Sequence, residues 1–292
     1  MIRHSALESL GVWGRYSNAG GAGLTRTLWR YGRMHALPLP SGSRPRPFGR
    51  SGRVVVSLST LPSRIGLIRP VLNSLLDQEE PADEIVLVLP QASAREGGAP
   101  YEIAPDLARC AAVTILRCER DWGPATKLIP VLERECDPAT LVVAVDDDNV
   151  YPPALVANLL RWSARLPDAA LGHRGWSLTP SRDWRDTITL HATGLREPRA
   201  VDVVTGTWGL LVRPRFFDAA VRDYDGWPED AFFNDDIWFN GHLARRRVPR
   251  VVVPLGLPPI STTVSRVNGL CYVANRDGAH NNAVIQAFGA HW

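Results

Sequence analysis

The sequence is nearly without lysine: Lys127 is the only one among 33 basic residues, and all the others are arginine. It also lacks any apolar run near the roughly 18 residues that cross a bilayer and any secretory apolar segment, which predicts a cytoplasmic protein. The net charge of +3 gives no reason to expect nucleic acid as a partner. Four cysteines have neither zinc-site nor redox-pair spacing, so free thiols are expected: Cys110, Cys118, Cys136 and Cys271.

Acidic residues are scarce in residues 1–53, which contain nine arginines and one acid, Glu8. Glycine and proline fill the stretches NAGGAG and LPLPSGSRPRP, which are typical of flexible or extended linkers. We therefore expect residues 1–52 to form a basic Arg/Gly/Pro-rich arm. Three roles are open: an arm without fixed structure, a transit peptide, or a peripheral contact of residues 1–50 with anionic lipid at the inner face of the membrane.

Apolar strands alternate with helices from residue 54 onward. Strands are expected over 54–59, 84–89, 113–116 and 141–145, and helices over 67–76, 125–135 and 153–166. After about residue 170 the expected elements are strands over 201–204, 208–212 and 250–253 and a helix over 234–247. The pattern predicts one α/β domain, residues 53–292, with a mainly parallel sheet flanked by helices. A nucleotide-binding half, 53–150, would precede an irregular acceptor half, 151–292.

An acidic triplet, Asp146, Asp147 and Asp148, follows the fourth expected strand directly. Adjacent carboxylates repel one another, and a divalent cation such as Mg²⁺ or Mn²⁺ would compensate their charge and bind substrate phosphates. Ligands of open α/β sheets bind beyond the carboxyl ends of the strands, where the triplet is expected. The alternative is an acidic turn that caps the following helix, although a cap needs only one such residue.

Five motifs together resemble a known enzyme family: SLSTLPSR, DWGPATKL, VDDDNVYPP, TGTWGLLV and NDDIWFN, in this order. They are similar to those of GT-A-fold, nucleotide-sugar-dependent glycosyltransferases, especially the family-2-like bacterial enzymes that build surface glycans. The resemblance covers about residues 54–254. It implies a GT-A (Rossmann-like) fold and transfer of a sugar from a UDP-, GDP- or dTDP-linked donor to a glycan or lipid-linked acceptor. The aspartate pair of NDDIWFN favours inversion in this transfer, and the expected role is surface polysaccharide or glycoconjugate synthesis.

The resemblance assigns the triplet to a metal ion, Mn²⁺ or Mg²⁺, and to the donor. Asp148 would be the direct metal ligand. Asp146 would lie at the metal or, with Asp147, face the donor ribose or the water around the metal. His280 is the first candidate for a further metal ligand. A metal that bridges the donor diphosphate would neutralise the charge that develops on the departing nucleotide.

Three more residues are expected on the donor side. Lys127 follows the Gly-Pro turn of DWGPATKL and is expected at the start of a helix, which suits a phosphate group. A lysine serves there as a point charge, where arginine would demand bidentate geometry. Thr60 and Arg64, after the first strand, are expected beside the nucleotide base or ribose. The alternatives are a chance placement of the lysine and an ordinary surface turn.

The general base is expected in NDDIWFN, at Asp235 or, slightly less favoured, Asp236. Inverting sugar transfer needs a carboxylate that accepts the proton of the attacking hydroxyl, although acidic residues also stabilise a helix N-terminus without any catalytic role. His173 is a second candidate for the base. The acceptor side is expected to be formed by His173, Arg174, Trp176, Gly206 and Trp208.

Other functions fit the sequence less well. A nucleotidyltransferase acting on sugar phosphates would need a glycine-rich loop after the first strand, and SLSTLPSR contains no glycine. A phosphatase with an aspartate nucleophile would carry its acidic motif at the first strand. A non-catalytic glycan- or lipid-binding scaffold would not need the triplet, the lysine and the second acidic pair together.

Overall fold

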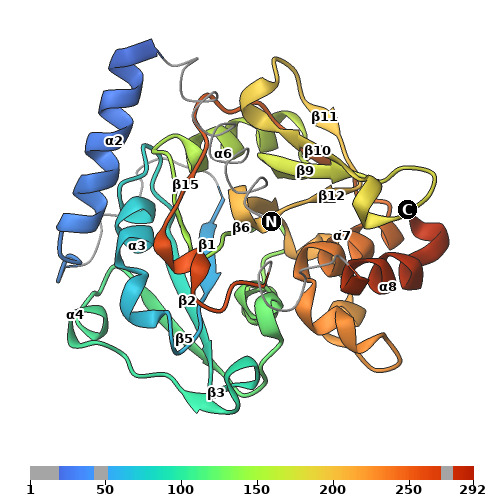
Figure 1. Ribbon diagram of the computed structural model, residues 1–292, viewed down its shortest axis with the longest axis horizontal. Coiled ribbons are helices and arrows are strands. Elements are labelled where there is room, and N and C mark those ends of the chain that lie inside the picture. The colour runs from blue at the N-terminus through green and yellow to red at the C-terminus, as the bar shows by residue number, and fades with distance from the viewer. Residues whose placement is uncertain (1–19, 43–51, 271–278) are drawn as a thin grey trace.

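The computed structural model describes residues 20–42, 52–270 and 279–292. Most of the expected arm, including residues 1–19 and 43–51, and Cys271 lie outside the described residues. The fold is α/β, as expected: a mixed central sheet of eight strands in the order β11-β14-β8-β13-β6-β1-β2-β5, flanked by helices (Figure 1). No helix in these three stretches is long and apolar enough to cross a membrane.

The first half of the sheet is parallel. It consists of β1 (Val54–Ser59), β2 (Glu84–Pro90), β5 (Thr114–Cys118) and β6 (Leu141–Ala144). β1 and β6 are central and almost completely buried, as their continuous apolar sequences require. Their carboxyl ends meet at one edge of the sheet, and the acidic triplet follows β6 there.

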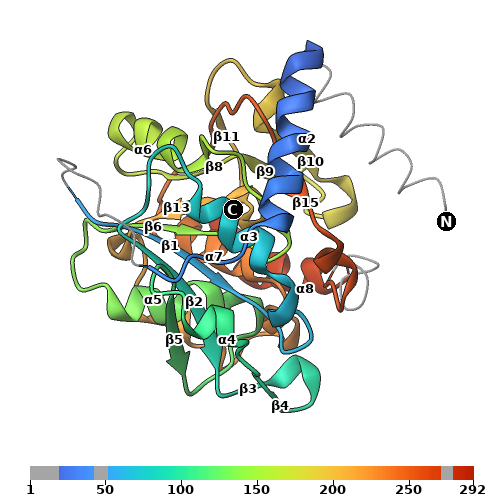
Figure 2. The same ribbon diagram turned by 90° about the vertical axis from the view of Figure 1, so that its left-hand side faces the viewer.

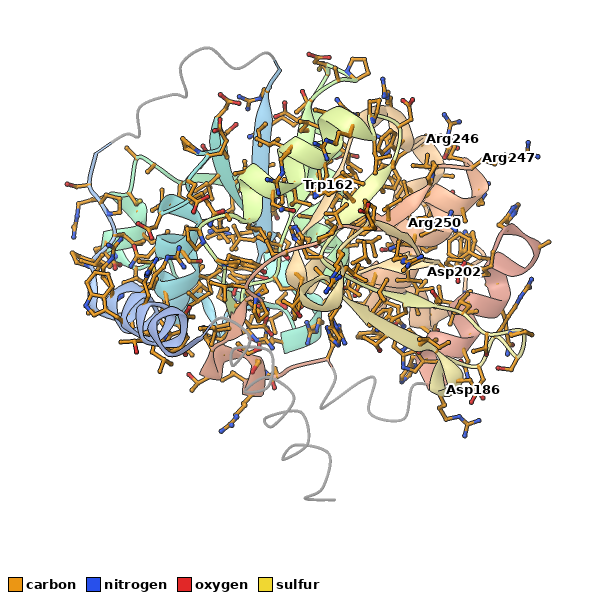
Figure 3. The ribbon with its side chains drawn as sticks, turned by 90° about the horizontal axis from the view of Figure 1, so that it is seen from above. Trp162, Asp186, Asp202, Arg246, Arg247 and Arg250 are labelled. Carbon is orange, nitrogen blue, oxygen red and sulfur yellow. The ribbon has the colours of Figure 1, made fainter. Side chains whose placement is uncertain are left out.

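The second half contains antiparallel pairings. β13 (Leu210–Val212) lies between β6 and β8 (Ala170–Gly172) and runs antiparallel to both, and β14 (Arg250–Val252) is parallel to β8. The edge strand is β11 (Arg199–Ala200). A smaller sheet contains β10 (Ile188–His191), β9 (Arg174–Ser177) and β12 (Val203–Val204). Arg250 joins the two sheets by donating to the Asp202 carbonyl at 3.1 Å (Figure 3).

Helices cover both faces of the central sheet. α3 (Arg69–Leu76) and α6 (Leu155–Arg165) bury leucines and valines against one face, and α5 (Ile129–Arg134), α7 (Asp235–Arg245) and α8 (Ala279–Phe288) pack against the other. The helix expected over 125–135 is shorter and begins differently: a 3₁₀ helix, Gly123–Lys127, precedes α5, so Lys127 ends a helical turn instead of opening a helix. The remaining short elements are α4 (Pro105–Ala108), β3 (Ala92–Ser93), β4 (Ala99–Pro100), β7 (Asn149–Val150) and β15 (Ile260–Ser261).

Part of the expected linker is a helix. α2 (Gly20–Ala36) includes the glycines of NAGGAG and lies along the molecule beside α3 (Figure 2). Met34 is 1% exposed, and the Asn73 amide of α3 donates to the carbonyls of Met34 and Leu37 at 3.0 and 2.9 Å. The expectation of a linker is therefore wrong for residues 20–23 of NAGGAG, because tertiary contacts of α2 with α3 outweigh the low helix propensity of glycine.

Candidate active site

The triplet is held by its backbone. Tyr151 is completely buried, and its hydroxyl accepts from the Asp146 N–H at 2.9 Å and donates to the Asp146 carbonyl at 3.0 Å. On the other side of the turn, the Thr262 N–H donates to the Asp148 carbonyl at 2.7 Å. These bonds fix the turn between β6 and β7, so the three side chains have defined directions. Sequence reasoning missed Tyr151, although it lies in VDDDNVYPP.

Asp147 points into the protein. Its two carboxylate oxygens accept from Thr60 Oγ1 at 2.6 Å and from Arg64 Nη1 at 2.8 Å, and Arg64 Nε donates to the Val267 carbonyl at 2.6 Å. Burial raises the pKa of Asp147, and the charge of Arg64 opposes this shift. The structure thus brings Thr60 and Arg64 to the triplet, where they tie the first loop and the C-terminal segment to Asp147.

Asp148 is half-buried beside like charges. Burial, together with the carboxylates of Asp146 and Asp147, raises the pKa of Asp148 to about 7. One oxygen accepts from the Asn149 amide at 2.7 Å. The Asp148 carboxylate therefore receives one neutral hydrogen bond from its neighbour while lying in a strongly negative environment.

Lys127 connects the triplet with a second acidic pair, Asp235 and Asp236, which we call the α7 pair. Its side chain is only 6% exposed, and its ammonium contacts Asp146 Oδ1 and lies 2.8 Å from Asp235 Oδ2. Burial lowers the pKa of a lysine, but here the carboxylates of Asp146 and the α7 pair outweigh burial and raise it well above the ordinary value. The ammonium therefore stays charged between the two acidic groups.

Asp236 differs from its neighbour in the α7 pair. Asp235 is buried against Lys127, whereas Asp236 is half-buried and its Oδ1 accepts from the Gly206 N–H at 2.8 Å. Burial and the adjacent Asp235 raise the pKa of Asp236 to about 8. Asp236 is thus the more accessible carboxylate of the α7 pair, and its own pKa is raised.

Two buried groups fix α7 and the TGTWG segment against the site. Asn240, one turn after Asp236, exchanges two hydrogen bonds with the Val204 backbone at 2.8 and 2.9 Å. A Cβ atom on Gly206 would lie 2.8 Å from Lys127 Nζ, so only glycine fits there without displacement. The i, i+4 spacing of Asp236 and Asn240 in NDDIWFN is the signal by which Asn240 could have been found.

Other expected residues lie apart from these carboxylates. His173 is completely buried, with Nδ1 at 3.1 Å from the Trp208 carbonyl and Nε2 at 2.9 Å from the Asn158 side chain. Burial lowers the pKa of His173 to about 4. A buried, fully bonded imidazole cannot meet an acceptor, so the expectation of His173 as base or acceptor contact is corrected to a structural role.

Aromatic side chains of the acceptor half contact one another. The Arg174 guanidinium lies 5.3 Å from the Trp176 ring centroid, and Trp176 meets Trp184 edge to face at 4.2 Å. Trp208 is 8% exposed and its ring lies 5.2 Å from that of His191. Arg174 and Trp176 are half-buried on the small sheet, and Trp208 contributes mainly to the core.

His280 does not join the triplet in the described structure. Its Nδ1 contacts an oxygen of Asp230 and its ring lies 6.3 Å from Phe233, so it connects α8 to the segment before α7. The described stretches contain no set of three or more histidine, cysteine or acidic side chains arranged to hold a metal. Mg²⁺ and Mn²⁺ commonly use one or two carboxylates and complete their coordination with water and substrate phosphate. Asp146 and Asp148 can supply that smaller set.

The net charge of the site also fits a cation. Two cationic side chains, Lys127 and Arg64, form ion pairs with the triplet and the α7 pair, which together have five carboxylates. Buried negative charge of this size is costly unless it is compensated. A divalent cation between Asp146 and Asp148 would reduce the imbalance.

Comparisons with known proteins give structural similarity only. No protein-family model and no curated protein matches the sequence. Among solved structures, the fold is similar to mannosyltransferase PcManGT from Pyrobaculum calidifontis in complex with GDP-Man and Mn²⁺, with 20% identity and a TM-score of 0.47 over 79% of this chain. This chain covers 62% of that one, which is less than two thirds of its length.

A second similar structure is S. aureus TarS 1–349, with 13% identity and a TM-score of 0.46 over 77% of this chain and 74% of that chain. A mannosyltransferase is therefore among the solved structures that this fold resembles. The activity of this chain has to be inferred from its own side chains.

Proposed function

We propose that this protein is a glycosyltransferase that moves a sugar from a nucleotide-sugar donor to a hydroxyl group of a glycan or lipid-linked acceptor. The observation that carries the proposal is the position of Lys127, whose ammonium contacts both the triplet and the α7 pair. Segments about 90 residues apart thereby meet beyond the carboxyl ends of the strands, where α/β proteins bind their ligands.

The donor side is formed by the triplet and Lys127. Asp146 and Asp148 would hold Mg²⁺ or Mn²⁺, and the bound ion would neutralise charge on the donor diphosphate and on the departing nucleotide. Lys127 supplies a positive charge at the same place and holds Asp146 in position. Asp147, through Thr60 and Arg64, fixes the loop that would border the nucleotide.

The acceptor side is formed by the α7 pair and Gly206. We assign the general base to Asp236, since its pKa of about 8 gives it the basicity to take a proton from an attacking hydroxyl and it is half-buried instead of ion-paired. The Gly206 N–H orients the Asp236 carboxylate, whereas the Asp235 carboxylate forms an ion pair with Lys127. A base that deprotonates the acceptor for direct displacement implies inversion at the sugar carbon.

A thermal-shift screen tests the proposal. UDP-, GDP- and dTDP-sugars would be added with and without Mn²⁺ to the wild type, to Asp148→Asn and to the matched control Asp168→Asn, whose side chain is 81% exposed. We expect Mn²⁺-dependent stabilisation by one nucleotide class in the wild type and the control and its loss in Asp148→Asn. If none of the nucleotide sugars stabilised the protein, donor binding would be contradicted and the non-catalytic scaffold would be favoured.

A further inference from the structure

Exposed apolar side chains gather at α2. In the described parts of the chain, large hydrophobic side chains with substantial exposure are Leu28 (49%), Trp29 (64%), Leu37 (41%), Leu67 (46%) and Ile188 (63%). The first three belong to α2 or to the residue after it. Leu67 lies two residues before α3, on which α2 packs (Figure 2). Four of the five therefore lie on one side of the molecule, and such grouping marks an interaction surface.

The charged side chains of α2 itself all have one sign. α2 contains Arg26, Arg30, Arg33 and His35, and the described side chains of this helix include no acid. Arg30 and Arg33 reach inward to Asp77, while Arg26 is exposed and the Arg33 guanidinium lies 5.5 Å from the Trp29 ring centroid. The outer face thus combines a tryptophan and leucines with arginine.

We propose that this outer face of α2, with Leu28, Trp29, Leu37 and Leu67, docks on an anionic lipid surface. Tryptophan and leucine insert at the boundary between headgroups and acyl chains, and arginine is attracted to lipid phosphates. A second copy of the chain fits less well, because a two-fold interface would place two cationic faces against each other. The inference is independent of the proposed reaction.

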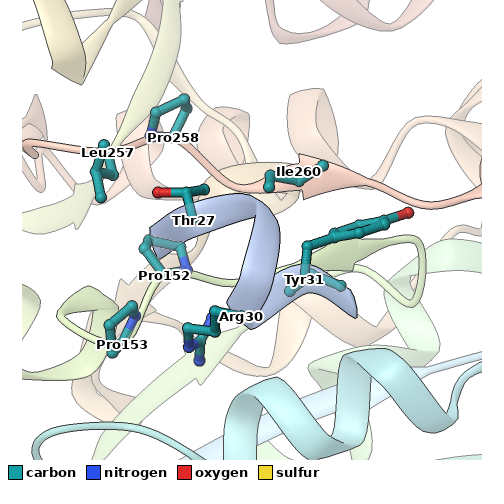
Figure 4. A pocket seen from close by; sticks show the side chains of 9 residues that line it. Thr27, Arg30, Tyr31, Pro152, Pro153, Leu257, Pro258 and Ile260 are labelled. Carbon is teal, nitrogen blue, oxygen red and sulfur yellow. The ribbon is translucent and has the colours of Figure 1, made fainter. Parts of the chain in front are cut away.

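The helix is fixed firmly enough to orient the protein on that surface. Arg30 Nε donates to Asp77 at 2.9 Å and its Nη1 donates to the Tyr151 carbonyl at 2.6 Å. A pocket between α2 and the segments at 150–153 and 257–260 is lined by Thr27, Arg30 and Tyr31 on the α2 side (Figure 4). Since Tyr151 also holds the backbone of Asp146, a docked α2 would set the position of the candidate active site relative to the lipid surface.

Vesicle flotation tests the inference. The full-length wild type, the double variant Leu28→Ser/Trp29→Ser and the control Ile188→Ser would be mixed with phosphatidylglycerol-containing vesicles and with pure phosphatidylcholine vesicles. Ile188 is as exposed as Trp29 but lies on β10, away from α2 (Figure 1). We expect preferential binding to the anionic vesicles, weakened about tenfold or more in the double variant and unchanged in the control. Added salt should also weaken binding.

Three results would overturn the inference. The first is equal binding of the wild type to both vesicle types, and the second is equal binding of the double variant and the wild type. The third is a wild type that is dimeric by light scattering and a double variant that is monomeric, which would make this face an interface between copies. Thermal unfolding of each variant separates loss of binding from loss of folding, and because both substituted side chains are exposed, unfolding should change little.

Discussion

The substitution Gly206→Ala tests whether the ammonium of Lys127 is held as tightly as its contacts indicate. Gly206 has no positive φ, so alanine suits the backbone, but its Cβ atom would lie 2.8 Å from Lys127 Nζ and 3.3 Å from Cε. A lysine end normally moves aside at little cost. Here it lies between Asp146 and Asp235, so any movement away from Gly206 weakens a buried ionic contact.

The expected magnitude follows from packing. Insertion of one extra methyl group into a well-packed site costs about 1–3 kcal/mol of unfolding free energy. Gly194→Ala is a matched control, because nothing lies within 4 Å of its Cβ position and its φ is also not positive. Both variants share the gain of up to about 1 kcal/mol that alanine confers by restricting the unfolded chain, so the difference between them isolates the clash with Lys127.

Urea unfolding at neutral pH measures this difference, and the Mn²⁺-dependent donor shift measures its effect on the site. We expect Gly206→Ala to be less stable than Gly194→Ala by about 1–3 kcal/mol and to show a smaller donor shift. Equal unfolding free energies for the two variants would refute the reasoning, because Lys127 would then be free to move.

Three further predictions concern charge. Lys127→Met should lower the unfolding free energy by about 3–5 kcal/mol, since it leaves the buried Asp235 and the half-buried Asp146 without their cation. A loss below about 1 kcal/mol in urea unfolding would contradict this. Asp236→Asn keeps an oxygen for the Gly206 N–H but cannot accept a proton, so sugar transfer should slow by about 10²–10⁴-fold while the donor-induced thermal shift persists. For the wild type, kcat/KM should rise with pH through about 8. A fully active Asp236→Asn variant would exclude Asp236 as the base. Burial lowers the pKa of His173 to about 4, so between pH 6.5 and 4 the unfolded chain binds a proton that the folded chain does not, and stability should fall by about 3 kcal/mol as pH falls through this window. In urea unfolding at several pH values, the stability of His173→Gln should depend less steeply on pH than that of the wild type. An identical pH dependence would mean that His173 does not titrate this way.

The central sheet and the meeting of the motifs could be predicted from the sequence. β1 and β6 are buried on both faces and therefore have continuous apolar sequences, and the triplet directly follows β6. Parallel strands place their carboxyl ends at one edge, so the sequence could place the Lys127 loop and Asp146 at the same edge of the sheet, but not in contact. The contact of Lys127 with Asp235 required the packing of α7, which no local pattern encodes.

The remaining features depend on tertiary contacts. Glycine-rich sequence favours a linker, but α2 forms because Arg30, Arg33 and Met34 find partners on the body of the protein. His173 has the residue type of a catalytic base, and only its burial reveals a structural role. Tyr151 acts on Asp146 through a hydroxyl bonded to backbone atoms, which leaves no signature in the sequence.

The solitary, buried lysine makes the candidate active site chemically addressable. In this sequence Lys127 supplies the only ε-amino group, and in the folded protein its side chain is 6% exposed. Amine-selective reagents, such as isotopically labelled formaldehyde with a reductant, should therefore modify Lys127 only when the site opens. The rate of Lys127 labelling would report the local opening free energy of this site alone. A nucleotide sugar that slows this labelling would be identified as a donor that binds and closes the site.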